Sequence, residues 1–363
     1  MNRNCYRLVF NTTLGMMVPV AETARRSGKT GSGKATSGAA LALAGALMAS
    51  SAWADGPVGC SATITCGPSS ISALSAAGNV AMYQNAEKTR TFIDQVGSRA
   101  IGDFKSFNTS AGHTVQVGQV DAFGGNYVPN ASFNFLGRIW DANPTVFAGN
   151  LIQAAGQRAN VTLVNSNGIA FMNGSQVNLG SFTASTLNIA DSFINDTLLT
   201  RDGKPQFENA LDGGEGRGFI KVFEGAQITA ASQGRVMLIA PTVINKGTIA
   251  APDGQVILAA GSKVFLRSAS AYGDDNVRGL LVEVDSPAAL ADFDTANPDV
   301  ADGELDGETV ALGNAAEDKL GHVTNLGELS SQRGNVTMVG YAVNQQGIAR
   351  ATTSVVANGS VYL

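Results

Sequence analysis

The chain has 363 residues, of which 43 are glycine, 15% are charged and 7% are aromatic. This composition argues against a globular enzyme core with large aromatic anchors and favours many tight turns joining short strands. Six of the 24 basic residues but only one of the 29 acidic residues lie in the first 54 positions, so the remainder carries a net charge of about −10. Nucleic-acid binding needs a basic patch, and we therefore expect no nucleic-acid partner.

The first 54 residues form a predicted export signal. Residues 35–54 are uncharged, follow a basic stretch and end in Ala52-Trp53-Ala54, which fits the small-x-small preference of signal peptidase. We predict cleavage before Asp55. A membrane anchor is the alternative, since about 20 residues can span a bilayer, but Ala, Gly and Ser dominate this stretch. Residues 28–35, GKTGSGKA, lack the hydroxyl that a phosphate-binding loop needs after its lysine, so no nucleotide site is expected.

This signal is longer than the 15–30 residues or so that export usually needs. Its additional part reads MNRNCYRLVFN, followed by GMMVPVAETAR. These segments resemble the extended signal-peptide region of very large exported proteins of Gram-negative bacteria. The resemblance implies that the extension slows or tunes inner-membrane export of a chain that must not fold early.

The segment 55–87 is expected to cap the mature chain at its N-terminus. Its Cys60 and Cys66 are an isolated pair in an exported chain, which predicts a disulfide, with two free thiols as the alternative. The histidines, His113 and His322, lie far along the chain, so no metal site is predicted at the cysteines, and no cofactor is expected.

The middle of the chain alternates short apolar runs with turn residues. Residues 113–123, 159–172 and 186–194 are predicted to be strands, whereas the polar, glycine-rich residues 195–218 are predicted to leave the regular structure.

From about residue 219 the chain repeats itself. GRVMLIA (234–240) returns as GQVILAA (254–260) after twenty residues, and GNVTMVG (334–340) returns as GSVYL (359–363) after twenty-five. A period of 20–25 residues with short β-rich segments predicts a solenoid. The segments are too short and too rich in Val, Ile, Thr and Gly for a helical solenoid. We therefore predict an all-β fold, a right-handed parallel β-helix with extra-helical loops, in which alternate apolar residues point inward.

The stretch 267–321 interrupts the repeat. It carries 13 acidic residues between Asp274 and Asp318 against the single basic Arg278. We expect an acidic excursion in the form of a solvated loop or protruding subdomain. Calcium binding is the alternative, although the acids match neither an EF-hand nor a glycine-rich calcium repeat.

The chain from about residue 88 onward resembles the haemagglutination-activity domain of two-partner-secretion exoproteins of the filamentous-haemagglutinin type. AIGDFKSFN at 100–108 resembles the phrase that opens that domain. Asn143-Pro144-Thr145 resembles the family's Asn-Pro-Ser, and LVNSNGIAF at 163–171 resembles its Asn-Pro-Asn-Gly-Ile hallmark, with Ser166 where proline is usual. The turn is expected to be looser here, because serine lacks the fixed φ of proline.

The resemblance implies a route and a partner. The protein would cross the inner membrane, be recognised in the periplasm by the receptor domains of a TpsB-type outer-membrane β-barrel transporter, and fold outside the cell. The secretion domain would span 88–266, and 322–363 would add further coils of a truncated or longer product. The resemblance implies that the residues needed for recognition are Asn143, Pro144, Thr145, Asn165, Asn167, Gly168 and Ile169. The alternative is that these residues only form turns, since turn chemistry alone also explains them.

The expected function is that of a secreted or surface-bound adhesin scaffold, for which a host or neighbouring cell surface is the second implied partner. The alternative is the N-terminal part of a contact-dependent toxin-delivery exoprotein, which would share this region. A β-helix enzyme that degrades polysaccharides needs acids stacked on adjacent coils. The acids here gather in one segment, so no enzyme is predicted and no catalytic residue is assigned.

Overall fold

The computed structural model describes residues 6–11, 16–21, 57–59, 80–189, 206–213, 218–268, 279–285, 296–297, 300–314, 317–351 and 360–362. Residues 1–49 form one unit, in which β1 (Tyr6–Asn11) pairs antiparallel with β2 (Met16–Ala21). Residues 50–363 form the other. The expected cleavage site at Ala52, Ala54 and Asp55 and the expected pair Cys60 and Cys66 lie outside the described residues.

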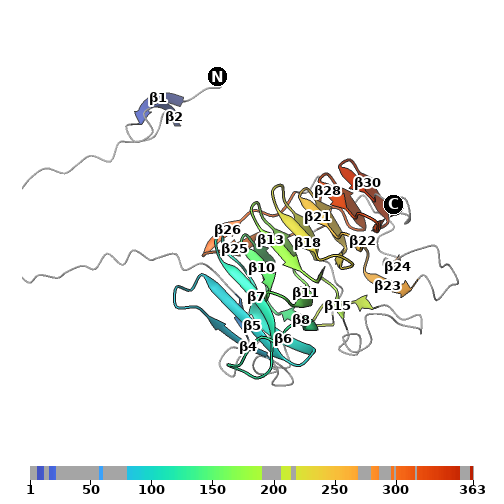
Figure 1. The fold of residues 1–363 in the computed structure, drawn as a ribbon. Helices are drawn as coiled ribbons and strands as arrows, with labels where there is room; N and C mark the ends of the chain where they lie inside the picture. The colour runs from blue at the N-terminus through green and yellow to red at the C-terminus, as the bar shows by residue number, and fades with distance from the viewer. Residues whose placement is uncertain are drawn as a thin grey trace, which may run out of the picture. The chain divides into compact units, whose positions relative to one another are not determined.

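The second unit is a parallel β-helix, as the repeats predict (Figure 1). The chain visits three sheets in turn, so strands of successive coils lie side by side in each sheet. The first sheet contains β4 (Val80–Gln84), β5 (Arg90–Val96), β7 (Thr114–Val120), β10 (Asn150–Gln153), β13 (Gln176–Leu179), β18 (Gln227–Ala230), β21 (Thr248–Ala250), β28 (Glu328–Ser330) and β31 (Ile348–Arg350). The second contains β3 (Val58–Gly59), β6 (Arg99–Ser106), β8 (Ser132–Ile139), β11 (Arg158–Val164), β14 (Ser181–Ser185), β19 (Arg235–Ala240), β22 (Gln255–Ala260), β29 (Asn335–Val339) and β32 (Ser360–Tyr362). The third contains β9 (Thr145–Phe147), β12 (Ile169–Phe171), β17 (Phe219–Val222), β20 (Thr242–Asn245), β27 (His322–Asn325) and β30 (Ala342–Gln345).

The register of the second sheet matches the sequence repeats. Arg235 faces Gln255 across β19 and β22, and Asn335 faces Ser360 across β29 and β32, so the intervals of twenty and twenty-five residues are each one coil. β22 pairs directly with β29, with Gln255 facing Asn335, because the intervening acidic stretch leaves the coils.

The interior is a continuous stack of apolar side chains. In the N-terminal coils five phenylalanine rings follow one another, and the rings of Phe147 and Phe171 lie parallel with centroids 5.1 Å apart. Toward the C-terminus smaller residues take over, for example Val236, Val256 and Val336, each fully buried. Each such side chain contributes roughly 1.5–3 kcal/mol by leaving water, so every coil stabilises its neighbour.

A ladder of buried amides runs along one corner of the helix. The Asn245 Nδ2 donates to Asn325 Oδ1 at 2.7 Å, and Asn325 Nδ2 donates to Gln345 Oε1 at 2.9 Å. Asn245 also caps its own turn, because its Oδ1 accepts the Gly247 N–H at 3.1 Å. The Asn-x-Gly steps of the sequence are therefore turns whose polar side chains bind to one another inside the fold.

A fourth, antiparallel sheet covers the outer face of the second sheet. Residues 195–218 were expected to leave the coils. In the described part of that stretch, Phe207–Glu208 form a strand of this covering sheet. Met237 and Ile239, which point away from the helix interior, are buried beneath it, and this explains why VMLIA is apolar at every position. The sheet consists of β15 (Asn188–Ile189), β16 (Phe207–Glu208), β23 (Lys263–Ser268) and β24 (Leu280–Asp285).

Over its described part the acidic stretch leaves the coils and most of its acidic side chains are exposed, but it also packs on the β-helix through its apolar residues. Residues 296–297, 300–314 and 317–320, here called the strap, run back over the third sheet. The strap contains the hairpin β25 (Gly303–Leu305) and β26 (Glu308–Val310). Apolar residues between its acids, Leu312 above all, pack on the helix.

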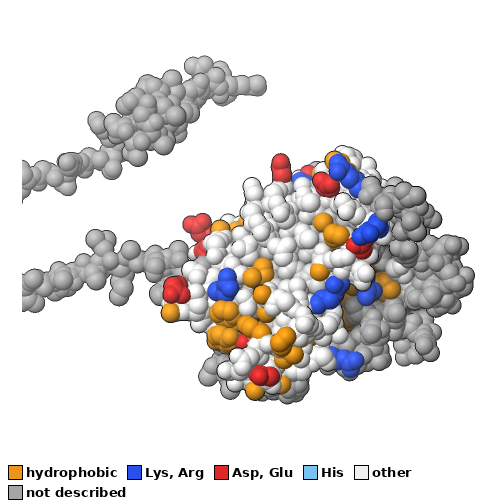
Figure 2. All heavy atoms as spheres, viewed as in Figure 1, with side chains coloured by type: hydrophobic (Ala, Val, Ile, Leu, Met, Phe, Trp, Pro, Cys, Tyr) orange, Lys and Arg blue, Asp and Glu red, His pale blue; other side chains and the backbone are white. Residues whose placement is uncertain are grey.

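Apolar side chains gather on the surface at the end of the helix where β4 and β5 lie (Figure 2). Tyr83 and Phe123, at 49% and 47% exposure, are the most exposed rings there. In the described part of the chain, no helix is long and apolar enough to cross a membrane.

Candidate functional site

The structure brings the two expected recognition motifs together. Thr145 begins β9 and Ile169 begins β12, and these two residues are direct partners in the third sheet. The Thr145 N–H donates to the Gly168 carbonyl at 2.9 Å, which joins the turn before one strand to the start of the other. The motifs, separated by about one coil in sequence, are thus stacked corners of adjacent coils, and we call them the motif pair.

Asn165 joins the two corners. Its side chain is fully buried, and its Nδ2 donates to the Asn143 carbonyl at 3.0 Å and to Thr145 Oγ1 at 2.8 Å. Its Oδ1 accepts the Asn167 N–H at 2.9 Å, which closes the turn. An amide is the side chain that donates twice and accepts on one planar group, so it satisfies groups on both coils.

The turn after Asn165 depends on glycine. Gly168 has φ +130°, and a Cβ there would lie 2.7 Å from the Phe219 ring. The serine that replaces the usual proline is also anchored, because Ser166 Oγ accepts the Leu211 N–H at 2.8 Å. This contact restrains the turn in place of the fixed φ that proline would supply.

Exposure divides the motif pair into two groups. Asn143 and Asn167 are exposed, and Asn167 Nδ2 donates to the Asp141 carbonyl at 2.6 Å, while Asp141 Oδ1 accepts the Asn143 N–H at 3.0 Å. The buried group cannot touch a partner of the folded protein and shapes the corner instead. It consists of Pro144, Thr145, Asn165, Gly168 and Ile169.

The strap lies directly beside this corner. Leu312 packs with Val146, Ala170 and Phe219, and all four side chains are buried. Val146 and Ala170 are register partners, and each sits between inward-facing residues of its strand, so they form the outer face of β9 and β12.

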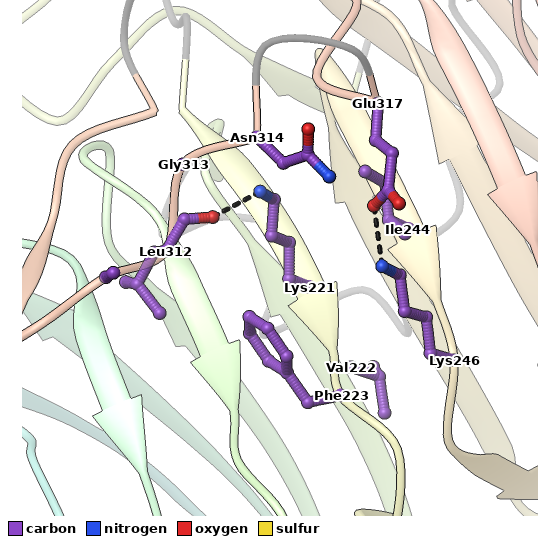
Figure 3. Close-up of a pocket in the computed structure, with 10 residues that line it drawn as sticks. Lys221, Val222, Phe223, Ile244, Lys246, Leu312, Gly313, Asn314 and Glu317 are labelled. Carbon is purple, nitrogen blue, oxygen red and sulfur yellow. Dashed lines mark hydrogen bonds and ion pairs between the residues drawn. The ribbon is translucent and has the colours of Figure 1, made fainter. Parts of the chain in front are cut away.

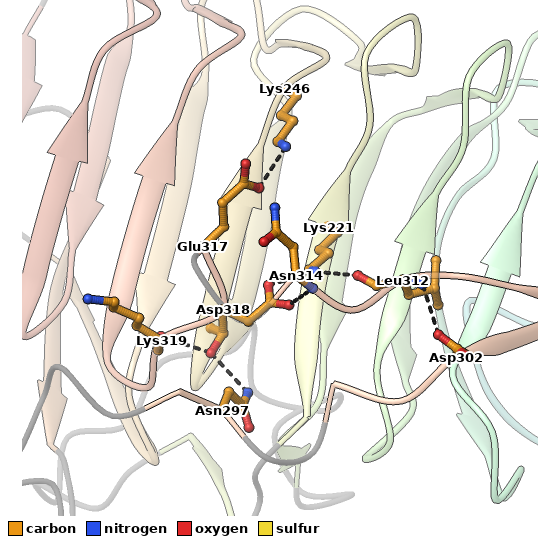
Figure 4. A network of polar contacts seen from close by, with 10 residues as sticks. Lys221, Lys246, Asn297, Asp302, Leu312, Asn314, Glu317, Asp318 and Lys319 are labelled. Carbon is orange, nitrogen blue, oxygen red and sulfur yellow. Dashed lines mark hydrogen bonds and ion pairs between the residues drawn. The ribbon is translucent and has the colours of Figure 1, made fainter. Parts of the chain in front are cut away.

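A buried lysine fixes the middle of the strap (Figures 3 and 4). Lys221 Nζ lies 2.6 Å from Asp318 Oδ1, with both side chains almost fully buried, and it also donates to the Leu312 carbonyl. Burial lowers the pKa of Lys221, and Asp318 opposes that shift. A cavity of about 220 Å³ lies between Lys221, Lys246 and strap residues 311–314, and Lys246 pairs with Glu317 at 2.6 Å.

The hairpin of the strap lies beside the motif pair. Asn108 Nδ2 donates to the Glu304 carbonyl at 3.0 Å, and Ser110 Oγ donates to Asp306 Oδ1 at 2.5 Å. Burial raises the pKa of Asp141, and the nearby charge of Glu304 adds to that rise. The hairpin therefore brings negative charge to a corner that already carries a carboxylate.

Sequence reasoning missed Lys221, Asp318 and Asn108 as parts of this site. The sequence does indicate that Lys221 is unusual, because a lysine inside the apolar run FIKV needs a partner if it is buried. The identity of that partner depends on the path of the strap, which has no periodicity. Among the described residues, no group of three or more His, Cys, Asp or Glu side chains is placed to hold a metal.

Two family models match the chain. Residues 1–51 match the extended signal peptide of the type V secretion system, and residues 69–362 match the TPS secretion domain. No curated protein matches.

The solved structures that are similar to this chain include two secretion domains. The HMW1 secretion domain from Haemophilus influenzae has 22% identity and a TM-score of 0.53, over 78% of this chain and 59% of that one. The filamentous hemagglutinin secretion domain has 16% identity and a TM-score of 0.43, over 85% of this chain and 99% of that one. The first likeness supports the same fold, and this chain spans less than two thirds of that structure.

Proposed function

The chain belongs to the family of TPS secretion domains and begins with the extended signal peptide of type V secretion systems, and from this premise we propose that an outer-membrane transporter recognises its first coils. It is the N-terminal domain of a two-partner-secretion exoprotein, which passes through the periplasm and is secreted from a Gram-negative cell. The observation that carries the proposal is the motif pair, because Asn165 ties two coils into one corner with a buried amide.

In this proposal the buried half of the motif pair acts by building the corner. Asn165 satisfies groups on both coils, and Gly168 allows the turn to pass under Phe219. The exposed part contributes less: the Asn167 side chain donates to the Asp141 carbonyl, and the Asp141 carboxylate accepts the backbone N–H of Asn143. The transporter then recognises the surface that this corner presents.

Secretion of matched variants tests this division. The full chain is expressed with its transporter, and the fraction of protein outside the cell is measured by immunoblot. Asn165→Ala is expected to lower that fraction at least fivefold, whereas Asn143→Ala with Asn167→Ala retains more than half of it. Asn178→Ala, an exposed asparagine on the first sheet, is the control. Undiminished secretion of Asn165→Ala would refute the proposal.

We further propose that folding outside the membrane helps to draw the chain out. No nucleotide site is needed if each coil gains free energy by packing on the one before it. Three consecutive register partners in the second sheet, Val236, Val256 and Val336, illustrate this gain, since all are fully buried.

Adhesion is proposed for the exoprotein to which this domain belongs, with a host or neighbouring cell surface as the target. A solenoid presents an extended surface that suits such contacts, and the rings of Tyr83 and Phe123, in the N-terminal part of the β-helix, are about half exposed. Binding of the secreted chain to erythrocytes or epithelial cells, reduced by Tyr83→Ser, would support the proposal. Absence of any cell binding would limit the domain to export.

A further inference from the structure

Lys221 and Asp318 are held in contact away from water (Figure 4). Lys221 Nζ lies 2.6 Å from Asp318 Oδ1, and the two side chains are only 6% and 2% exposed. In the third sheet Lys221 lies between Ala170 and Ile244, its register partners, and both of these are buried. Burying an ion pair costs the hydration of both ions, whereas an amide formed from the same two groups carries no charge.

Neighbouring groups hold the amine and the carboxyl group in place. Lys221 Nζ donates to the Leu312 carbonyl, which restrains the amine beside the carboxyl group (Figure 3). The Asn314 backbone N–H donates to Asp318 Oδ2 at 2.5 Å. A donor therefore already faces the oxygen on which negative charge would build up during attack on the carboxyl carbon. The Asp318 backbone is fixed as well, because its N–H donates to the Asn314 carbonyl at 2.8 Å.

Burial also favours the reactive form of the lysine. It lowers the pKa of Lys221, against the opposing effect of Asp318, and so favours the neutral amine, which is the nucleophile. Groups that a protein holds in a reactive geometry behave as if present at effective concentrations of up to about 10⁵–10⁸ M. The cavity of about 220 Å³ beside Lys221 has room for the water that condensation releases.

A neighbouring pair shows what distinguishes Lys221 and Asp318. Lys246 Nζ and Glu317 Oε2 are also 2.6 Å apart, but both side chains are 32% exposed. Water stabilises the charged forms of these two groups, so we expect them to remain an ion pair. The two pairs differ in burial and agree in distance, and the exposed pair is therefore an internal control.

We propose that Lys221 and Asp318 condense into an intramolecular isopeptide bond, which fastens the strap covalently to the third sheet. The Asp318 carboxylate first takes one proton from the Lys221 ammonium group. The neutral Nζ then attacks the carboxyl carbon, so that an N–C bond forms and the C–Oδ1 bond breaks. Oδ1 leaves as water with two of the three protons that Nζ carried, and the third stays on the amide nitrogen. The step needs no oxidant and no further reactant.

The ion pair is the state of the freshly folded chain, from which the bond forms. The bond then keeps the strap over the apolar outer face of β9, β12 and β17, where Leu312 packs. The sequence has no cysteine after Cys66, so no disulfide within the coils could fasten the strap in this way. The reaction involves only this chain and is independent of the transporter.

Peptide mapping of the folded full chain tests the bond. Trypsin does not cleave after a bonded lysine, so the bond joins residues 218–235 to residues 279–319 in one branched peptide that is lighter than their sum by one water. Chemical cleavage at methionine gives an independent readout, because residues 173–237 and 238–338 then stay joined on a denaturing gel. Neither of these fragments contains cysteine, so a disulfide cannot account for the link.

Matched variants separate the bond from the packing around it. Lys221→Arg keeps the positive charge but removes the amine, and it should abolish the branched peptide, whereas Lys246→Arg should leave the branched peptide at the parent level. In the parent we expect the branched peptide to hold at least half of the recovered 279–319 sequence.

A parent chain that yields only the separate peptides, while circular dichroism shows that its coils are folded, would overturn the inference. A link that persists in Lys221→Arg would overturn it as well, because the bond would then involve other residues. Fragment spectra that place the link at Lys246 and Glu317 would count against burial as its cause.

Discussion

Asn165→Ala provides a quantitative test of the corner that the motif pair forms. The substitution removes three hydrogen bonds, namely those to the Asn143 carbonyl, Thr145 Oγ1 and the Asn167 N–H. A neutral hydrogen bond contributes about 1 kcal/mol net, and unsatisfied buried partners add to the loss, so the free energy of unfolding should fall by about 3 kcal/mol. With a urea dependence of about 3 kcal/mol per molar, the unfolding midpoint should shift by about 1 M.

Urea unfolding of the purified chain, followed by circular dichroism, is the assay. Asn167→Ala is the matched control, because its exposed side chain makes one bond to the Asp141 carbonyl and its loss should cost less than about 1 kcal/mol. A midpoint shift for Asn165→Ala no larger than that of the control would refute the reasoning. The amide would then not join the two coils.

Three further predictions follow from the packing. Lys221→Met alone should destabilise the fold by about 3–5 kcal/mol because it leaves Asp318 buried and unpaired, and adding Asp318→Leu should recover most of that loss in urea unfolding. Burial lowers the pKa of His113, so its neutral form favours folding, and stability should fall as pH drops below about 6.5; His113→Gln should flatten this pH dependence. Leu258→Pro removes a backbone donor between β19 and β29 and should leave chains stalled in the outer membrane, detected by protease accessibility; normal secretion would count against coil-by-coil folding.

Much of the fold could be predicted from the sequence because each coil of a β-helix repeats the pattern of the coil before it. The strand register can therefore be read as the interval between repeats. The intervals from Arg235 to Gln255 and from Asn335 to Ser360 are visible as echoed phrases, and each is a strand pairing. The motif pair was also predictable as turns, since Asn and Gly tolerate such corners.

The covering elements could not be predicted in the same way. Leu312 packs on Val146, and Asp318 pairs with Lys221. These partners are far apart in the sequence, and no repeat relates them. The 13 acids between positions 274 and 318 suggested solvent exposure, and Asp302, Glu304, Asp306 and Glu308 are exposed, but the strap also packs on the helix through apolar residues that lie between those acids. The net charge of a segment therefore does not predict whether the segment packs on the helix when only one of its sides is buried.

The central claim is that this domain leaves the cell through a dedicated outer-membrane transporter and is folded as a β-helix outside. The most direct measurement is the distribution of the full chain between periplasm and medium in cells with and without that transporter. The account predicts protease-resistant, β-rich protein in the medium when the transporter is present, and retention in the periplasm when it is absent. Equal amounts in the medium under both conditions would contradict it.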